Sequence, residues 1–103
     1  MRLIVMFDLP TGSKAERKTY ARFRNFLIED GFVREQFSIY SRILLTRESA
    51  AMHIERIRRN LPSSGVVTVF EMTEKQYSSR HRLLNTTPKS PRQELGTQLT
   101  LLI

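Results

Sequence analysis

The feature that most constrains the fold is an unbroken apolar run at the start of the chain, Leu3 to Phe7, which ends abruptly on a carboxylate, Asp8. A strand with one face in water alternates apolar and polar residues, so a continuous run is typical of a strand buried on both faces. A turn containing Pro10 and Gly12 follows. The run therefore predicts a central strand, and Asp8 stands where the chain leaves the core.

The length of 103 residues fits one domain, and a domain this small gains from association with a second copy. The chain has no cysteine, which excludes a Cys-based metal site and fits a reducing cytoplasm. No apolar run reaches the roughly 18 residues that a membrane helix needs, and the N-terminus does not resemble a signal peptide. We expect a soluble cytoplasmic protein that does not bind membranes.

The charge balance points to a polyanionic partner. Seventeen Lys and Arg residues against ten Asp and Glu give a formal net charge of +7. Nucleic acid is the favoured partner, and the alternative is a soluble domain that is basic without binding a polyanion. Arg far outnumbers Lys, which favours bidentate contacts with phosphate over simple solvation.

A helix is predicted from about residue 14 to residue 30. Ser13 precedes Glu16 by three residues, the capping-box spacing, and Asp30–Gly31 provides a left-handed stop. The apolar members share one side of this helix and are interpreted as core rather than as a base-stacking platform: Tyr20, Phe23, Phe26 and Leu27.

The opposite side of the same helix is cationic. Lys14, Lys18 and Arg22 stand four residues apart, and Arg17 and Arg24 flank them. Two interpretations remain open, a solvated surface and a surface that contacts phosphates.

Two strands and a second helix are predicted next. The strands cover residues 32–36 and 37–45, and alternation places Tyr40 and Ser41 on opposite faces of the second one. The helix spans about 48–60, and its late arginines complement the helix dipole, so they have a local explanation. Its expected buried stripe is Ala50, Ile54, Ile57 and Leu61, with His53 as a boundary residue.

A β-branched strand at 66–72 completes the order strand, helix, strand, strand, helix, strand. This order predicts an α+β, ferredoxin-like βαββαβ domain over residues 1–80, with a four-stranded antiparallel sheet and both helices on one face. The uncovered face of the sheet predicts a homodimer.

The rest of the chain, residues 81–103, is predicted to be a linker and an extra C-terminal strand. One helical turn is expected at 74–77, and residues 98–103 alternate like a strand. We expect this strand to be exchanged between subunits, or added to the edge of a sheet, at the dimer interface.

Asp8 is the one residue whose position suggests chemistry. A single carboxylate is a poor metal site, but a two-fold dimer would bring two copies together, and such a pair could hold Mg²⁺, polarise a phosphate and activate water. Alternatively, Asp8 caps the following turn through backbone amides. Composition and spacing alone favour the turn cap. The sequence offers no nucleophile–base pair and no phosphate-cradling glycine-rich loop.

Several segments together resemble the CRISPR-associated protein two family, the small subunit of the spacer-acquisition machinery. The resemblance covers residues 1 to about 80, in order and with the family's spacings. The segments that carry it are Met6-Phe-Asp-Leu-Pro10, Glu16-Arg-Lys18, Tyr20-Ala-Arg-Phe-Arg-Asn-Phe-Leu27, Gly31-Phe32, Gln36-Phe-Ser-Ile-Tyr40 and Thr73-Glu-Lys-Gln-Tyr77.

The resemblance implies a ferredoxin-like homodimer that bridges dimers of the integrase subunit, CRISPR-associated protein one, and holds double-stranded DNA for spacer integration. It implies as an alternative a Mg²⁺-dependent endonuclease acting on RNA or DNA, with Asp8 as the catalytic, metal-binding aspartate. Arg17, Arg34 and Tyr40 match positions linked to nucleic-acid contact or activity. Outside this family, the remaining alternative is a basic regulatory or RNA-binding domain.

Overall fold

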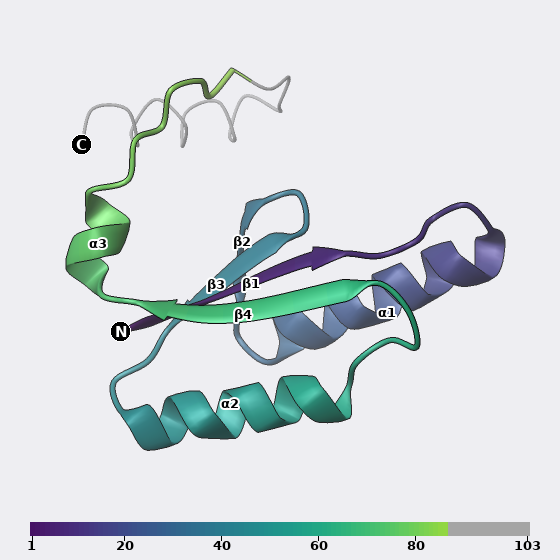
Figure 1. Ribbon diagram of the computed structural model, residues 1–103, viewed down its shortest axis with the longest axis horizontal. Coiled ribbons are helices and arrows are strands. Elements are labelled where there is room, and N and C mark those ends of the chain that lie inside the picture. Colours follow the sequence, from purple (N-terminus) through teal and green to yellow (C-terminus); the bar gives the residue numbers. More distant parts are fainter. Residues whose placement is uncertain (87–103) are drawn as a thin grey trace.

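The structure, a computed structural model, describes residues 1–86 (Figure 1). Its elements follow the predicted order, and a short helix stands where one helical turn was predicted at 74–77. They are β1 (Arg2–Asp8), α1 (Lys14–Glu29), β2 (Val33–Gln36), β3 (Ile39–Ile43), α2 (Arg47–Arg59), β4 (Val66–Met72) and α3 (Glu74–Ser78). The predicted α+β, ferredoxin-like architecture is confirmed. The strand expected at 98–103 lies outside the described residues.

The sheet has four strands in the order β2-β3-β1-β4, and every neighbouring pair is antiparallel. β1 lies between β3 and β4, so the apolar run is central, as predicted. Both α1 and α2 lie on one face of the sheet (Figure 1). We call this the helix face and the opposite one the open face.

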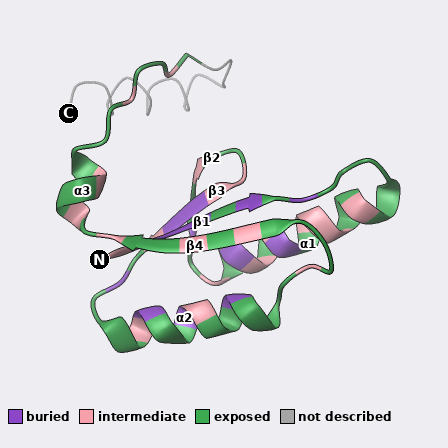
Figure 2. Cartoon of the chain, in the orientation of Figure 1, coloured by how far each residue is buried: buried purple, intermediate pink, exposed green. Residues whose placement is uncertain are grey.

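The core lies between the sheet and the two helices. Leu3, Val5 and Phe7 of β1 point to the helix face and are at most 5% exposed. They pack with the other buried members of one cluster: Leu9, Phe23, Leu27, Phe32, Tyr40, Leu44, Ala50 and Ile57. Figure 2 shows the buried positions gathered on the strands and on the inner sides of the helices.

The prediction that β1 is buried on both faces is wrong for Met6. Met6 lies on the open face, and its side chain is 39% exposed, whereas Ile4 on the same face is 6% exposed. The difference arises because no second layer of the described chain covers the open face beside Met6.

Helix α1 begins and ends as the sequence indicates. The Ser13 side chain accepts from the Glu16 amide, and the Glu16 carboxylate accepts from the Ser13 amide, which completes the capping box. Gly31 follows the helix with φ +90°, a conformation that glycine adopts without the strain a Cβ would bring.

The strand predicted at 37–45 begins later than expected. Phe37 and Ser38 form the turn of the β2–β3 hairpin, and β3 starts at Ile39. Ser38 has φ +63°, and its carbonyl accepts a 3.1 Å hydrogen bond from the Phe7 amide. No glycine marks this turn, which is why the residue pattern placed Phe37 and Ser38 inside the strand predicted at 37–45.

Helix α2 differs from expectation at two positions. Leu61 is 48% exposed rather than buried, because the helix ends at Arg59 and Leu61 belongs to the following loop. His53 is 2% exposed, so its assignment as a boundary residue is wrong.

No helix within residues 1–86 is long and apolar enough to cross a membrane.

Candidate nucleic-acid interface and the Asp8 position

Asp8 is the last residue of β1 and is exposed on the open face of the sheet, in register with Val66 of β4. Gly65, just before β4, has φ +105°, and a Cβ there would lie 2.7 Å from the Asp8 carbonyl oxygen. Gly65 therefore lets the α2–β4 loop pass close to the end of β1. The sequence analysis did not single out Gly65, although a glycine directly before a strand is a usable signal.

The turn-cap interpretation of Asp8 finds no support in the described residues. Ser13 caps α1, its own amide donates to Glu16 Oε1 at 2.9 Å, and the Asp8 carboxylate forms no hydrogen bond within residues 1–86. Within residues 1–86, no group of three or more His, Cys, Asp and Glu side chains could hold a metal. One chain therefore offers a single exposed carboxylate at this position.

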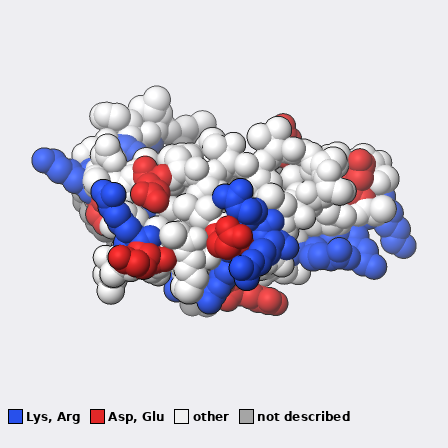
Figure 3. All heavy atoms as spheres, turned by 60° about the horizontal axis from the view of Figure 1, so that its bottom comes forward, with Lys and Arg blue, Asp and Glu red and all other residues white. Residues whose placement is uncertain are grey.

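The cations predicted on α1 lie on its outer surface. Lys14, Arg17, Lys18 and Arg22 are exposed, whereas Phe23 and Leu27 are buried on the inner side. None of the ion pairs within residues 1–86 involves the α1 cations, Arg24 included. Arg17 donates a 3.2 Å hydrogen bond to the Thr11 carbonyl. Figure 3 shows basic side chains along the lower right of this side of the molecule, where Figure 1 places α1.

Arg34 and Tyr40 face each other across β2 and β3 but differ in access. Arg34 is exposed, whereas Tyr40 is 4% exposed, and its ring lies 5.9 Å from that of Phe7 in a stacked arrangement. The structure therefore places Arg34 where a ligand can reach it and Tyr40 in the core. A direct contact of Tyr40 with nucleic acid stays a prediction.

The three arginines in the last turn of α2 are paired with acids. Arg58 Nε lies 3.2 Å and Arg59 Nε 3.8 Å from carboxylate oxygens of Glu55. Arg56 NH1 lies 2.8 Å from Asp30 Oδ1. The local explanation that the sequence suggested for these arginines therefore extends beyond the helix dipole to direct ion pairs.

Asp30 also binds the buried histidine. His53 Nδ1 lies 2.6 Å from Asp30 Oδ2, and the two side chains are 2% and 6% exposed. Arg42 donates to the Asp30 carbonyl. This cluster joins the end of α1 to α2 and β3. Sequence reasoning missed it, because Asp30 and His53 are 23 residues apart.

A second polar cluster lies on the open face at the other end of β1. The Arg2 guanidinium stands 3.7 Å from the centre of the Tyr77 ring and donates to Glu74 at 2.7 and 2.9 Å. It also donates to Ser41 Oγ at 3.0 Å, and the Tyr77 hydroxyl donates to Glu35. These contacts hold α3 against β1 and β2 at one end of the open face.

The protonation of this cluster follows from its contacts. The hydrogen bond from Arg2 lowers the pKa of Glu74 and, in return, raises the pKa of Arg2. Burial, followed by the hydrogen bond to Glu35, raises the pKa of Tyr77. The cluster is therefore held in one charge state, with Arg2 cationic, Glu74 anionic and Tyr77 neutral.

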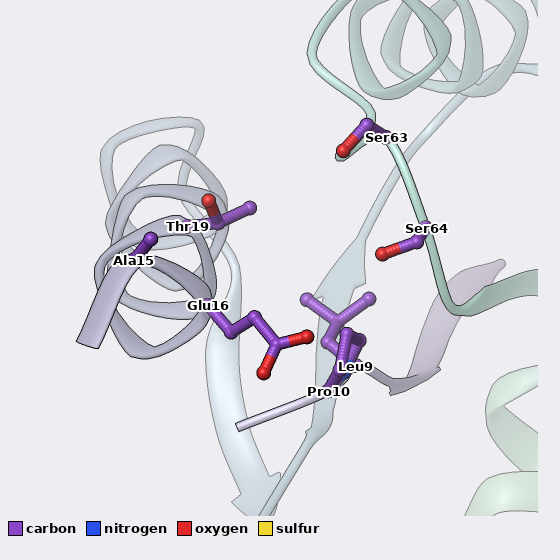
Figure 4. A pocket seen from close by; sticks show the side chains of 7 residues that line it. All are labelled: Leu9, Pro10, Ala15, Glu16, Thr19, Ser63 and Ser64. Carbon is purple, nitrogen blue, oxygen red and sulfur yellow. The ribbon is translucent and has the colours of Figure 1, made fainter. Parts of the chain in front are cut away.

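A pocket of about 270 Å³ lies between the first turn of α1 and the α2–β4 loop (Figure 4). The one ionisable side chain in its lining is Glu16, which is already bound to the Ser13 amide. The pocket therefore offers the hydroxyls of Thr19, Ser63 and Ser64 but no second ionisable side chain. Its lining residues are Leu9, Pro10, Ala15, Glu16, Thr19, Ser63 and Ser64.

Taken together, fold and site define a ferredoxin-like α+β protein whose first helix carries five cations without an ion pair in the described residues and whose central strand ends on an exposed carboxylate. Comparison with known families matches residues 1–80 to the family described as CRISPR associated protein Cas2. The chain belongs to this family, as its motifs suggested, so the alternative of an unrelated regulatory or RNA-binding domain is excluded.

Curated relatives named CRISPR-associated endoribonuclease Cas2 support the assignment. One from Acidovorax ebreus (strain TPSY) is 49% identical over 84 residues, covering 82% of each chain. One from Streptococcus mutans is 45% identical over 78 residues, covering 76% of this chain and 72% of the relative. One from Campylobacter jejuni is 41% identical over 101 residues, covering 98% of this chain and 71% of the relative.

A solved structure supports the fold. The crystal structure of Streptococcus pyogenes Cas2 at pH 6.5 superimposes with a TM-score of 0.63, covering 81% of this chain and 99% of that one. At 17% sequence identity, the likeness concerns the fold alone.

Proposed function

We propose that this protein is a homodimeric, DNA-binding scaffold of the CRISPR adaptation complex, which bridges dimers of the integrase subunit and holds a double-stranded protospacer for integration. The observation that carries the proposal is the set of exposed α1 cations without acid partners in the described chain. Phosphate contacts from such cations give affinity without sequence preference, which suits a protein that must hold arbitrary DNA.

The open face of the sheet supports the homodimer. Register places several part-exposed or exposed apolar residues there, and a second copy would bury them: Met6, Val33, Ile43, Val66 and Phe70. Burial of apolar surface stabilises association by about 25 cal/mol per Å² before the costs of binding are subtracted. Asp8 lies on this same face, so a symmetric pairing would bring two carboxylates towards one another.

The alternative function is Mg²⁺-dependent cleavage of RNA or DNA. The Asp8 carboxylate is a hard oxygen donor that is exposed and free of hydrogen bonds in the described residues, so it fits a magnesium ligand. A second carboxylate has to come from the partner copy. The ion would supply charge stabilisation at a phosphate and an activated water. The name endoribonuclease carried by the relatives favours keeping this alternative.

Assays of integration and nuclease activity, run side by side on the wild type and Asp8→Asn, test the two functions. Both proteins are first co-purified with the integrase subunit, to verify that dimer and complex form. We expect Asp8→Asn to leave integration unchanged and to abolish any Mg²⁺-dependent cleavage. Loss of integration by Asp8→Asn in an intact complex would refute a purely scaffolding role. Cleavage that survives the substitution would show that Asp8 is not the catalytic group.

A further inference from the structure

The β2–β3 turn presents an exposed aromatic ring that the core does not use. Phe37 is 72% exposed, yet its ring is stacked on Tyr20, with centroids 5.7 Å apart and planes 17° from parallel. Tyr20 in turn lies 5.5 Å from Phe7 of β1. The exposed ring is therefore the outer member of an aromatic row that is anchored in the core.

The backbone under this ring is fixed on two sides. The Tyr20 hydroxyl and Ser38 Oγ are 2.7 Å apart, and the Ser38 carbonyl accepts from the Phe7 amide at 3.1 Å. Phe7 directly precedes Asp8, so the turn lies at the end of the sheet where β1 ends. Phe37 is thus held in place by its supports while much of its surface faces water.

Three arginines without an acid partner in the described residues lie on the two elements that carry or adjoin the aromatic row. Arg17 and Arg24 stand three residues before and four after Tyr20 on α1, hence on the same side of the helix. Arg34 precedes the turn on β2 and is exposed. None of these three arginines forms an ion pair within residues 1–86. The nearest acid along the helix, Glu16, is bound to the Ser13 amide.

We propose that Phe37 is a stacking platform for an unpaired nucleobase, and that Arg17, Arg24 and Arg34 hold the phosphates on either side of that base. Proteins that bind single strands combine aromatic rings, on which bases stack, with cations along the backbone path. A base inside a duplex has no free face, so this subsite selects unpaired nucleotides. The inference rests on the proposed binding of nucleic acid and adds a second class of contact to it.

A tryptophan substitution gives a direct readout, because the chain contains no tryptophan. Phe37→Trp keeps an aromatic platform and introduces the one indole of the protein. We expect a single-stranded oligonucleotide to quench its fluorescence, and a blunt duplex with the same number of phosphates to leave it nearly unchanged. Comparing the quenching by DNA and RNA oligonucleotides of the same sequence shows which of the two nucleic acids supplies the stacked base.

Binding measurements with Phe37→Ala complete the test. Loss of one stacked base corresponds to a weakening of about 5- to 150-fold for single strands, whereas duplex affinity should change by less than about twofold. Leu45→Ala is the matched control, since Leu45 is an apolar side chain that is 95% exposed in another loop. An abasic oligonucleotide should bind wild type and Phe37→Ala equally.

The outcomes separate this inference from the proposed function. Normal single-strand binding by Phe37→Ala, or indole fluorescence that no single strand affects, overturns the stacking site while the phosphate contacts of α1 stand. An equal loss for single strands and duplex also overturns it. If the wild type binds neither nucleic acid, both the inference and the proposed function fail.

Discussion

Helices α1 and α2 are both rich in cations, and the difference between them lies in what the cations contact. In α2, Arg56, Arg58 and Arg59 each lie within 4 Å of a carboxylate. In α1, the exposed Lys14, Lys18 and Arg22 have no acid partner in the described chain. Similar sequence composition therefore gives two arrangements: the cations at the end of α2 contribute to the internal cohesion of the domain, and those of α1 are left for the external polyanion of the proposed function.

The comparison teaches that pairing is a better guide than charge to a binding surface. A paired arginine must give up its carboxylate before it can bind a phosphate, and its acid neighbour repels the incoming anion. An unpaired cation pays neither cost. This reasoning singles out α1, although arginines are at least as dense along the last turns of α2.

Reversing the α1 charges should have the largest effect. We expect Lys14→Glu, Lys18→Glu and Arg22→Glu together to weaken duplex binding by more than about 100-fold and to reduce the salt slope by about 3, because each lost phosphate contact removes about 0.9. Fluorescence anisotropy across a series of salt concentrations measures both. Arg47→Glu, Arg58→Glu and Arg59→Glu on α2 change the net charge equally and should cost less than about tenfold. Arg58 and Arg59 are the paired members, and Arg47, which has no ion pair within residues 1–86, completes the matched change in charge. Equal losses in the two triple variants would mean that net charge, and not α1, determines binding.

Removing the carboxylate between the helices should have the next largest effect, this time on stability. Asp30→Ala leaves His53 buried without a partner and frees Arg56, so we expect the free energy of unfolding to fall by about 3 kcal/mol. Urea unfolding measures the loss. Asp30→Asn keeps an acceptor for the imidazole and should lose less. The α1 triple variant should change stability by less than about 1 kcal/mol. If Asp30→Ala lowers the free energy of unfolding by less than about 1 kcal/mol, the cluster does not join the helices.

The contrast between these two sets of charges explains what sequence alone could reach. The capping box of α1, its glycine stop and its cationic surface depend on residues within a few positions of one another, so local spacing predicted them. The pairing of Asp30 with His53, and the contacts of Arg2 with Glu74 and Tyr77, join residues distant in sequence. No periodicity reports such contacts.

The β2–β3 turn shows a second limit of sequence reasoning. Phe37 and Ser38 have the composition of a strand, but Ser38 adopts a positive φ that is uncommon for a residue other than glycine. A hydrogen bond between the Ser38 and Tyr20 hydroxyls and one from the Phe7 amide to the Ser38 carbonyl hold it there, and both are tertiary. The exposed ring of Phe37 could therefore be recognised only after the fold was known. By contrast, the position of Asp8 at the end of a central strand followed from the apolar run itself.

The charged cluster under α3 should respond to alkaline pH, with a smaller effect than Asp30→Ala because its groups are only partly buried. The pKa of Tyr77 is raised in the folded state, so above its ordinary value of about 10 the unfolded chain releases the phenolic proton first. We expect stability to be complete below pH 10 and to fall as the pH rises above it. Urea unfolding of wild type and Tyr77→Phe at pH 8 and at about 10.5 isolates this residue from the other tyrosines. If stability declines equally in the wild type and in Tyr77→Phe, a group other than Tyr77 causes the loss at alkaline pH.

The exposed pairs at the end of α2 should have the smallest effect. Arg58→Ala and Arg59→Ala each remove a contact with Glu55 on the helix surface. Such an exposed pair contributes about 0.5 kcal/mol or less to stability, because solvent screens the charges and ordering the two side chains costs entropy. We expect each to change the free energy of unfolding by no more than that, and duplex affinity by less than about threefold. Arg22→Ala on α1 is the matched exposed arginine without an acid partner, and it should lower duplex affinity by about fivefold, close to the 1 kcal/mol of one phosphate contact. Anisotropy and urea unfolding on the three variants compare them directly. If Arg58→Ala weakens duplex binding as much as Arg22→Ala does, pairing with an acid does not remove an arginine from the binding surface, and the distinction between the two helices fails.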